Sequence, residues 1–125
     1  MNTAEGIYKS THYPLTEDER DLLERCKACQ PWWWRAVIKA AQVMPDRRGK
    51  YAGNLDPYFN FQDVARRRNV TVEEVFEWYL DMKTSRLAAR SGDFPDESLV
   101  DTHRDRANYA LLSTGYLIRQ QNEVK

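Results

Sequence analysis

The sequence has no long hydrophobic run, no excess of either charge sign and little glycine or proline. No stretch approaches the ~20 apolar residues that a membrane span needs, and the N-terminus lacks a signal-peptide pattern. Lys and Arg total 19 and balance 19 Asp and Glu, so net charge gives no case for binding a phosphate backbone. We therefore expect a cytoplasmic protein without a membrane partner, and the charge balance argues against a nucleic-acid ligand.

Five glycines and five prolines are too few for the many turns of a sandwich or barrel. A chain of 125 residues buries roughly two-thirds of the surface that its unfolded form exposes, enough for one core. The fold class we expect is all-α, a compact bundle of four to five helices. We expect a single domain over residues 1–125, with a flexible arm at 1–14 and a long functional loop at 46–60, before the third helix.

Two capping boxes set the beginnings of helices. Thr16 precedes Glu19 by three residues, and Thr71 precedes Glu74 in the same way, which is the signature of a helix N-terminus. Pro31 suits the first turn of another helix. These signals, with the breakers Pro45 and Gly92-Asp93-Phe94-Pro95, predict helices over about 17–29, 31–44, 61–68, 72–90 and 97–120.

The two cysteines, Cys26 and Cys29, form a C-x-x-C pair, which is also found in zinc and redox sites. Only His12 and His103 are available to complete a zinc site, and no strand precedes the pair as a redox motif requires. Leu22 and both thiols share one helical face. We therefore interpret them as buried, unreactive thiols that face a core.

Three adjacent tryptophans, Trp32, Trp33 and Trp34, begin the second predicted helix. This helix is apolar around most of its circumference, which is typical of a buried helix or of one that a partner covers. Two of the tryptophans would then lie in the core and one at the surface. The alternative is that the three form an exposed contact for a protein partner.

The long helix predicted from residue 72 carries basic residues on its apolar face. Val75, Phe76 and Tyr79 define the face expected to meet the core, and Lys83 and Arg86 fall inside the same arc. Charges in this position are costly unless they are paired or reach a ligand. Two interpretations stay open, ion pairs with acids of a neighbouring helix and a site that holds a phosphate.

The last predicted helix has a complementary polar stripe. Asp101, Asp105 and Asn108 follow one another at i, i+4 and i+7, so they point the same way. They can hold a divalent cation through oxygen ligands, pair with Lys83 and Arg86, or form a solvated face. The opposite side is expected to be the core face, and it consists of Val100, Ala107, Ala110, Leu111, Leu117 and Ile118.

From Lys50 to Tyr116 the chain resembles a small family of phage and bacterial proteins described only as nucleotide-modification-associated or uncharacterised. The family in turn is similar to the MazG-like all-α nucleoside triphosphate pyrophosphohydrolases. The motifs that carry the resemblance, in this order, are Lys50-Tyr51-Ala-Gly53, Asp56-Pro57-Tyr58-Phe59-Asn60-Phe61, Thr71-Val-Glu-Glu74, Asp81-Met-Lys83 with Arg86-Leu87, Asp96-Glu97-Ser98, and Asp101, Asp105 and Asn108-Tyr109-Ala110-Leu111-Leu112.

The resemblance implies a nucleotide or nucleotide-like ligand, a homo-oligomer and the cytoplasm of a bacterial or phage-infected cell. It implies Mg²⁺ as cofactor, with Asp101 and Asp105 as metal ligands. It also implies phosphate or ligand contacts from Lys83, Arg86, Tyr51, Asn54, Asn60 and Asn108. The second acidic motif of the enzymes, E-x-x-D, is not matched in this sequence. The nearest equivalent is Asp105-x-x-Asn108. An alternative is therefore a non-catalytic phage-type inhibitor or nucleotide-sequestering protein that uses Trp32, Trp33 and Trp34 against a partner.

Overall fold

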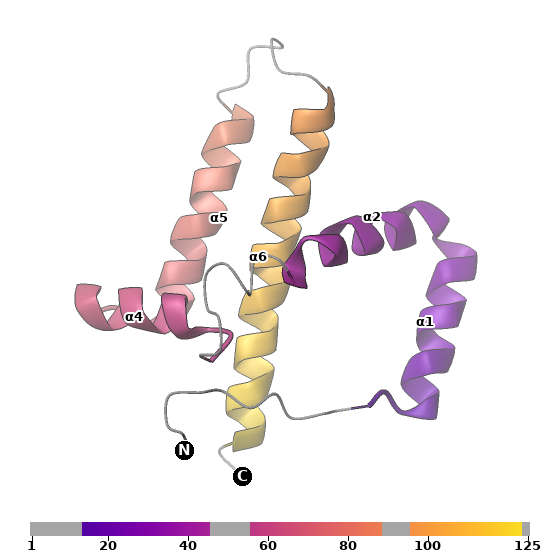
Figure 1. Ribbon diagram of the computed structural model, residues 1–125, viewed down its shortest axis with the longest axis horizontal. Helices are drawn as coiled ribbons and strands as arrows, with labels where there is room; N and C mark the ends of the chain where they lie inside the picture. The colour runs from indigo at the N-terminus through magenta and orange to yellow at the C-terminus, as the bar shows by residue number, and fades with distance from the viewer. Residues whose placement is uncertain (1–13, 46–55, 89–95, 124–125) are drawn as a thin grey trace. The chain divides into compact units, whose positions relative to one another are not determined.

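The computed structural model describes residues 14–45, 56–88 and 96–123. These residues form five helices, and no strand occurs among them, so the all-α prediction is confirmed (Figure 1). No helix in this part of the chain is long and apolar enough to cross a membrane. Contacts group the chain into two compact units, residues 1–57 and 58–125, which we describe separately. A single domain over residues 1–125 stays a prediction.

The first unit contains α1 (Glu17–Cys29) and α2 (Pro31–Gln42), which pack against each other. The backbone N–H of Glu19 donates to the Thr16 hydroxyl at 3.1 Å, and the Thr16 N–H donates to the Glu19 carboxylate at 2.8 Å. The predicted capping box is therefore present, and it begins α1 where the sequence indicated. Pro31 occupies the first turn of α2, as predicted.

The side chains of the first unit are more exposed than the sequence suggested. Cys29 and Leu22 are exposed and Cys26 is only half-buried, so the prediction of core-facing thiols is wrong. Trp32 is 79% exposed and Trp33 is also exposed, whereas Trp34 is half-buried and its ring lies 6.1 Å from that of Trp33. The expectation that two of the three tryptophans are core residues is therefore wrong as well.

The second unit contains α4 (Phe59–Arg68), α5 (Val72–Ala88) and α6 (Asp96–Glu123). Figure 1 shows α5 and α6 side by side, with α4 packed across the N-terminal end of α5. Asn69 ends α4 in the left-handed conformation, with φ 56°, which asparagine tolerates better than most residues. The predicted box at Thr71 begins α5, because the Glu74 N–H donates to the Thr71 hydroxyl at 3.1 Å.

The helix α4 begins at Phe59, two residues before the sequence prediction placed it. Residues 59 and 60 therefore belong to a helix, and 56–58 form the turn before it. The rest of the predicted functional loop, residues 46–55, lies outside the described residues. So does the predicted arm up to residue 13.

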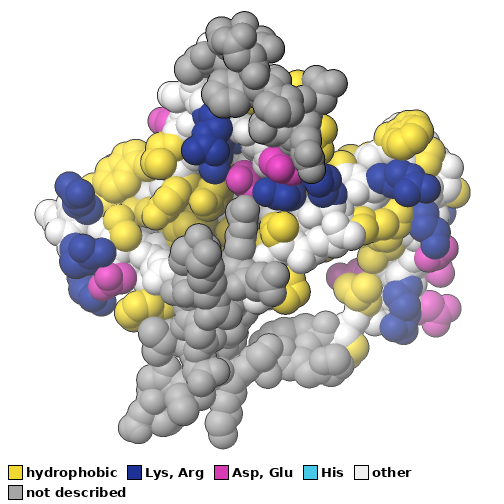
Figure 2. Space-filling model, turned by 45° about the horizontal axis from the view of Figure 1, so that its top comes forward, with side chains coloured by type: hydrophobic (Ala, Val, Ile, Leu, Met, Phe, Trp, Pro, Cys, Tyr) yellow, Lys and Arg dark blue, Asp and Glu magenta, His cyan; other side chains and the backbone are white. Residues whose placement is uncertain are grey.

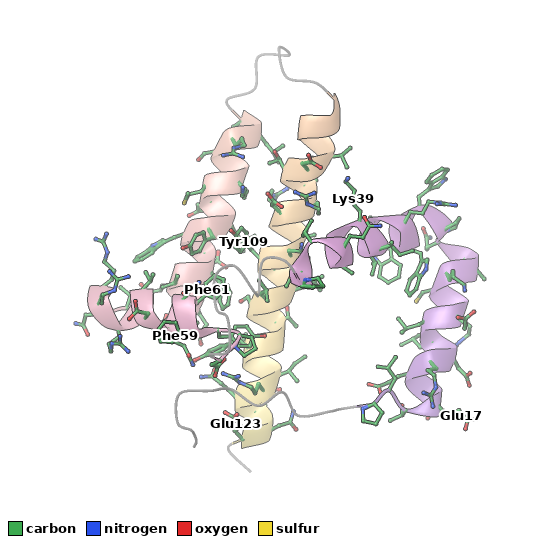
Figure 3. The ribbon with its side chains drawn as sticks, in the orientation of Figure 1. Glu17, Lys39, Phe59, Phe61, Tyr109 and Glu123 are labelled. Carbon is green, nitrogen blue, oxygen red and sulfur yellow. The ribbon has the colours of Figure 1, made fainter. Side chains whose placement is uncertain are left out.

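Aromatic rings form the core of the second unit. Phe76 is fully buried, and the ring of Phe61 lies 4.4 Å from it between centroids. Figure 3 shows Phe61 and Tyr109 approaching each other from α4 and α6, with their centroids 6.5 Å apart. Tyr79 stacks on Tyr109 at 5.1 Å. Such pairs bury large areas and fix ring geometry, so this cluster ties the three helices together.

The buried face of α6 is the polar one. Thr102, Asp105 and Asn108 are buried together with Tyr116. The face expected to be the core is exposed at every position that defined it: Val100, Ala107, Ala110, Leu111, Leu117 and Ile118. That prediction is wrong because Lys83 of α5 faces the N-terminal half of α6. Only the polar stripe of α6 can pair with the Lys83 charge.

Candidate functional site

An ion pair joins α5 to α6. The Lys83 Nζ lies 3.2 Å from Asp105 Oδ2, and the two side chains are 17% and 9% exposed. Both residues lie on helix faces that approach each other, since α5 and α6 pack along their lengths. Charges so far removed from water are stable only when they have partners. The predicted basic stripe and the predicted acidic stripe therefore meet.

Arg104 extends the pair into a cluster of four charges. Its Nε and Nη2 each lie 3.1 Å from Asp105 Oδ1, and its Nη1 lies 3.3 Å from Asp101 Oδ1. The Arg104 side chain is only 15% exposed. The Asp105 carboxylate thus accepts from Lys83 at one oxygen and from Arg104 at the other. We call Lys83, Asp101, Arg104 and Asp105 the charged cluster.

Two buried polar residues flank the charged cluster on α6. Thr102 precedes Asp105 by three residues and Asn108 follows it by three, so both lie within one turn. Each is about as buried as Asp105 itself. This concentration of polar groups inside a helical hairpin contrasts with the aromatic core that begins at Tyr109. The α5–α6 interface is therefore polar toward one end and aromatic toward the other.

The predicted site residues are only partly brought together. Lys83, Asp101, Asp105 and Asn108 lie at the α5–α6 interface, whereas Arg86 lies three residues beyond Lys83 and is exposed. Asn60 is half-buried in α4. Tyr51 and Asn54 lie outside the described residues, and Trp32, Trp33 and Trp34 belong to the other unit.

Arg104 was not among the residues that the sequence predicted for the site. Its spacing from Asp101 is i, i+3, the spacing of a helical ion pair, and this was the signal that could have found it. Its burial depends on the packing around α6, which no local spacing contains.

The charged cluster does not fit a resident metal ion in its present pairing. Both oxygens of Asp105 accept from cations, so a metal ion would have to displace Lys83 or Arg104. Among the described residues, no group of three or more His, Cys, Asp or Glu side chains is placed to hold a metal ion. Glu73, Glu77 and Asp81 of α5 are exposed.

A second basic surface lies at the end of α4. Arg66 and Arg67 both pair with Asp63 one turn earlier, the latter at 3.1 Å. Figure 2 shows Lys and Arg side chains, in dark blue, gathered at its left edge over α4, with an acidic side chain beside them. Basic residues in a last turn favour the helix dipole, which accounts for this run without a ligand.

Comparison with known proteins gave no match to any family model, any curated protein or any solved structure. The resemblance described from the sequence therefore stays a prediction, and the function rests on the residues themselves.

Proposed function

We propose that the second unit binds a phosphate-bearing nucleotide at the charged cluster. The observation that carries the proposal is the convergence of Lys83 and Arg104 on Asp105 between two helices. Replacing a buried ion pair with apolar residues of similar volume is often neutral or stabilising. A hairpin that served only as a scaffold would therefore have no need of this cluster, and its presence supports a role in recognition.

Lys83 is the residue best suited to contact phosphate. An ammonium group has three donors, and the ion pair with Asp105 uses one of them. Arg104 already directs three of its nitrogen atoms to carboxylates. The two cations and two carboxylates of the charged cluster cancel, so the cluster has no net charge. Arg86 is exposed one turn further along α5 and supplies the positive charge that the cluster lacks. Lys83 would hold the inner phosphate and Arg86 the outer ones.

The enzymatic version of this proposal is that the protein also hydrolyses the bound nucleotide with the help of Mg²⁺. Mg²⁺ would have to displace Lys83 or Arg104 from Asp105, because both cations contact this carboxylate. Binding without turnover, as in a sequestering protein, is what the side-chain pairing supports best.

The test is a thermal-shift titration with nucleoside triphosphates, diphosphates, monophosphates and the parent nucleosides, with and without Mg²⁺. We expect the phosphorylated ligands to stabilise the protein and the nucleosides to have no effect. Arg86→Ala should raise the ligand concentration needed for the same thermal shift about tenfold or more, as for loss of a charge-assisted contact. Arg66→Ala, which removes another exposed cation, on α4, is the matched control. An equal loss with both variants would reduce the binding to general charge attraction.

The same samples are analysed for released pyrophosphate. Release that requires Mg²⁺ and Asp105 would establish a pyrophosphohydrolase. Stabilisation without release would establish a sequestering protein. If no phosphorylated ligand shifts the transition, the nucleotide proposal is wrong, and the charged cluster serves only to join α5 to α6.

A second candidate function is favoured by the exposed tryptophans of α2. Trp32 is 79% exposed, and the Arg35 guanidinium lies 5.9 Å from the centroid of its ring. Tryptophan and arginine contribute most to binding energy at protein interfaces. We propose that this pair contacts a protein partner. Affinity capture with the wild type and Trp32→Ala, with the exposed Trp78→Ala of α5 as control, tests it. A partner lost equally with both variants would contradict a specific role of Trp32.

A further inference from the structure

Arg106 is a half-buried arginine of α6 whose polar atoms are incompletely satisfied. Its Nε is shielded from water and has no hydrogen-bond acceptor in the described part of the chain. Arginine does not lose its proton in proteins, so burial leaves the charge in place, and a buried donor without a partner lowers stability. A ligand that carries negatively charged oxygen atoms would supply the missing acceptor.

Arg106 shares one side of the α5–α6 hairpin with Arg86. The rings of Tyr79 and Tyr109 stack at 5.1 Å and mark this side. Arg86 follows Tyr79 by seven residues, which is two helical turns, and Arg106 precedes Tyr109 by three. The helical period therefore places both arginines on the side of the tyrosine pair. We call this side of the hairpin, with Tyr79, Arg86, Arg106 and Tyr109, the arginine side.

The two arginines are close enough to act on one ligand. Lys83 lies beside Asp105 across the antiparallel helices (Figure 1), so Arg86 lies about level with residue 102 of α6. Arg106 comes four residues later in α6, which is about 6 Å along the helix at 1.5 Å per residue. Two arginine side chains can bridge such a separation and donate to one anion from both helices.

The arginine side carries no acid among the described residues of α5 and α6. The carboxylates of Asp101 and Asp105 are engaged within the charged cluster. Each described acid of α5 lies about 120° or more around that helix from Arg86, at 100° per residue, and these acids are Glu73, Glu74, Glu77 and Asp81. The charges of Arg86 and Arg106 are therefore not balanced on their own side of the hairpin.

We propose that Arg86 and Arg106 form a binding site for an oxyanion with two adjacent charged groups, of which a diphosphate is the simplest. A guanidinium group binds a phosphate through two parallel N–H donors, so two arginines match two phosphate groups. Arg104 would have to leave Asp101 and Asp105 to bind an anion, whereas Arg106 forms no ion pair with any described residue.

This site shares Arg86 with the proposed nucleotide site and adds Arg106, which was not among the residues that the sequence predicted. It requires the two phosphate groups and not the nucleoside. The test therefore begins with inorganic anions, and failure of this inference can be distinguished from failure of the proposed function.

A thermal-shift titration of the full chain compares sodium pyrophosphate with sodium orthophosphate at constant ionic strength, which keeps general screening equal. We expect pyrophosphate to stabilise the protein at concentrations about tenfold or more below those of orthophosphate, because it engages both arginines. Arg106→Met should remove this difference. Arg68→Met, which removes an exposed cation at the end of α4, is the matched control and should keep it. Equal responses of the wild type to both anions would overturn the inference, as would an unchanged preference in Arg106→Met.

Urea unfolding without a ligand separates binding from a structural role. Methionine keeps the unbranched apolar stem of Arg106 and removes the unsatisfied nitrogen, so Arg106→Met should unfold at the same urea concentration as the wild type or at a higher one. An arginine that served the fold would show the opposite. A clearly lower midpoint for Arg106→Met would identify Arg106 as structural and overturn the inference.

A titration with ADP shows whether the anion belongs to a nucleotide. If pyrophosphate binds through Arg86 and Arg106 and neither ADP nor any other nucleotide binds, the diphosphate site stands and the nucleotide proposal is wrong. If ADP binds the wild type and Arg106→Met equally well, the nucleotide proposal stands and the role of Arg106 is refuted. Binding of both ligands, weakened in Arg106→Met and retained in Arg68→Met, is the result that we expect.

Discussion

Lys83 and Asp105 lie on different helices and pair at 3.2 Å with little access to water. Arg104 joins this ion pair as a third residue, because it approaches the other oxygen of the Asp105 carboxylate at 3.1 Å. Asp105 is therefore the centre of the charged cluster, and the two cations depend on it unequally. Arg104 also contacts Asp101, whereas the recorded ion pair of Lys83 is with Asp105.

We predict that Asp105→Asn destabilises the protein more than Lys83→Met does. Loss of the Asp105 charge leaves Lys83 without its counter-charge and Arg104 with Asp101 alone, which costs about 3–5 kcal/mol. Loss of Lys83 leaves Asp105 still paired with Arg104, so the cost should be roughly 1–2 kcal/mol. Urea unfolding followed by circular dichroism measures both. Equal losses would mean that Arg104 contributes nothing to holding Asp105.

The meeting of the two stripes was predictable, since Lys83 and Asp105 both lie on faces that the helical period directs toward a neighbour. The sequence could not decide which face of α6 is buried. Its six apolar positions, among them Val100, Leu111 and Ile118, outnumber the three polar ones, so periodicity favoured the apolar face as the core. Packing followed the residues of α5 instead, since only the polar face of α6 offers a partner for Lys83.

The helix boundaries were more predictable than the packing, for a physical reason. Thr16 and Thr71 act on backbone groups within three residues, so their effect is contained in the local sequence. The exposure of Trp32 depends on what surrounds α2, which no local pattern contains. The same limit applies to the ion pair of Lys83 with Asp105, which requires α5 to lie beside α6.

A second prediction concerns the aromatic core. Phe76 has no exposed surface and contacts the rings of Tyr58, Phe61 and Tyr116. Phe76→Ala should cost about 3–5 kcal/mol, because it leaves a cavity among side chains that three helices contribute. Met82→Ala on the exposed side of the same helix should change stability by less than about 0.5 kcal/mol. Thermal unfolding of the two variants compares them directly, and a small loss for Phe76→Ala would contradict its place in the core.

A third prediction separates a helix cap from a helix interior. Thr71→Ala removes the hydroxyl that accepts from the Glu74 N–H at 3.1 Å, and it should cost about 1 kcal/mol. Thr84→Ala is the matched control within α5. The Thr84 hydroxyl only donates to the Leu80 carbonyl at 3.0 Å, and alanine is the better helix former. Thr84→Ala should therefore be neutral or slightly stabilising in the same urea titration, and a loss equal to that of Thr71→Ala would exclude capping as the cause.

The fourth prediction is that Gly115→Ala destabilises the protein, although replacing a helical glycine by alanine usually stabilises a protein. Glycine within α6 should be replaceable by alanine with a gain of about 1 kcal/mol from propensity. At Gly115, however, an added Cβ would lie 2.8 Å from the Tyr58 hydroxyl oxygen. The Tyr58 ring cannot easily retreat, because it packs on Phe76 and Tyr116 and lies under the Arg119 guanidinium at 4.9 Å. We expect Gly115→Ala to destabilise by about 1–3 kcal/mol, the usual cost of overpacking.

The rescue experiment identifies the clash. Tyr58→Phe removes only the hydroxyl, which is the group that the new methyl would meet, and leaves the ring among its neighbours. In a double-mutant cycle, Gly115→Ala should be much less harmful in the Tyr58→Phe background, with a coupling of about 1 kcal/mol or more. If Gly115→Ala costs the same in both backgrounds, the hydroxyl is not the obstacle, and the close approach of Tyr58 to α6 is not what requires glycine at this position.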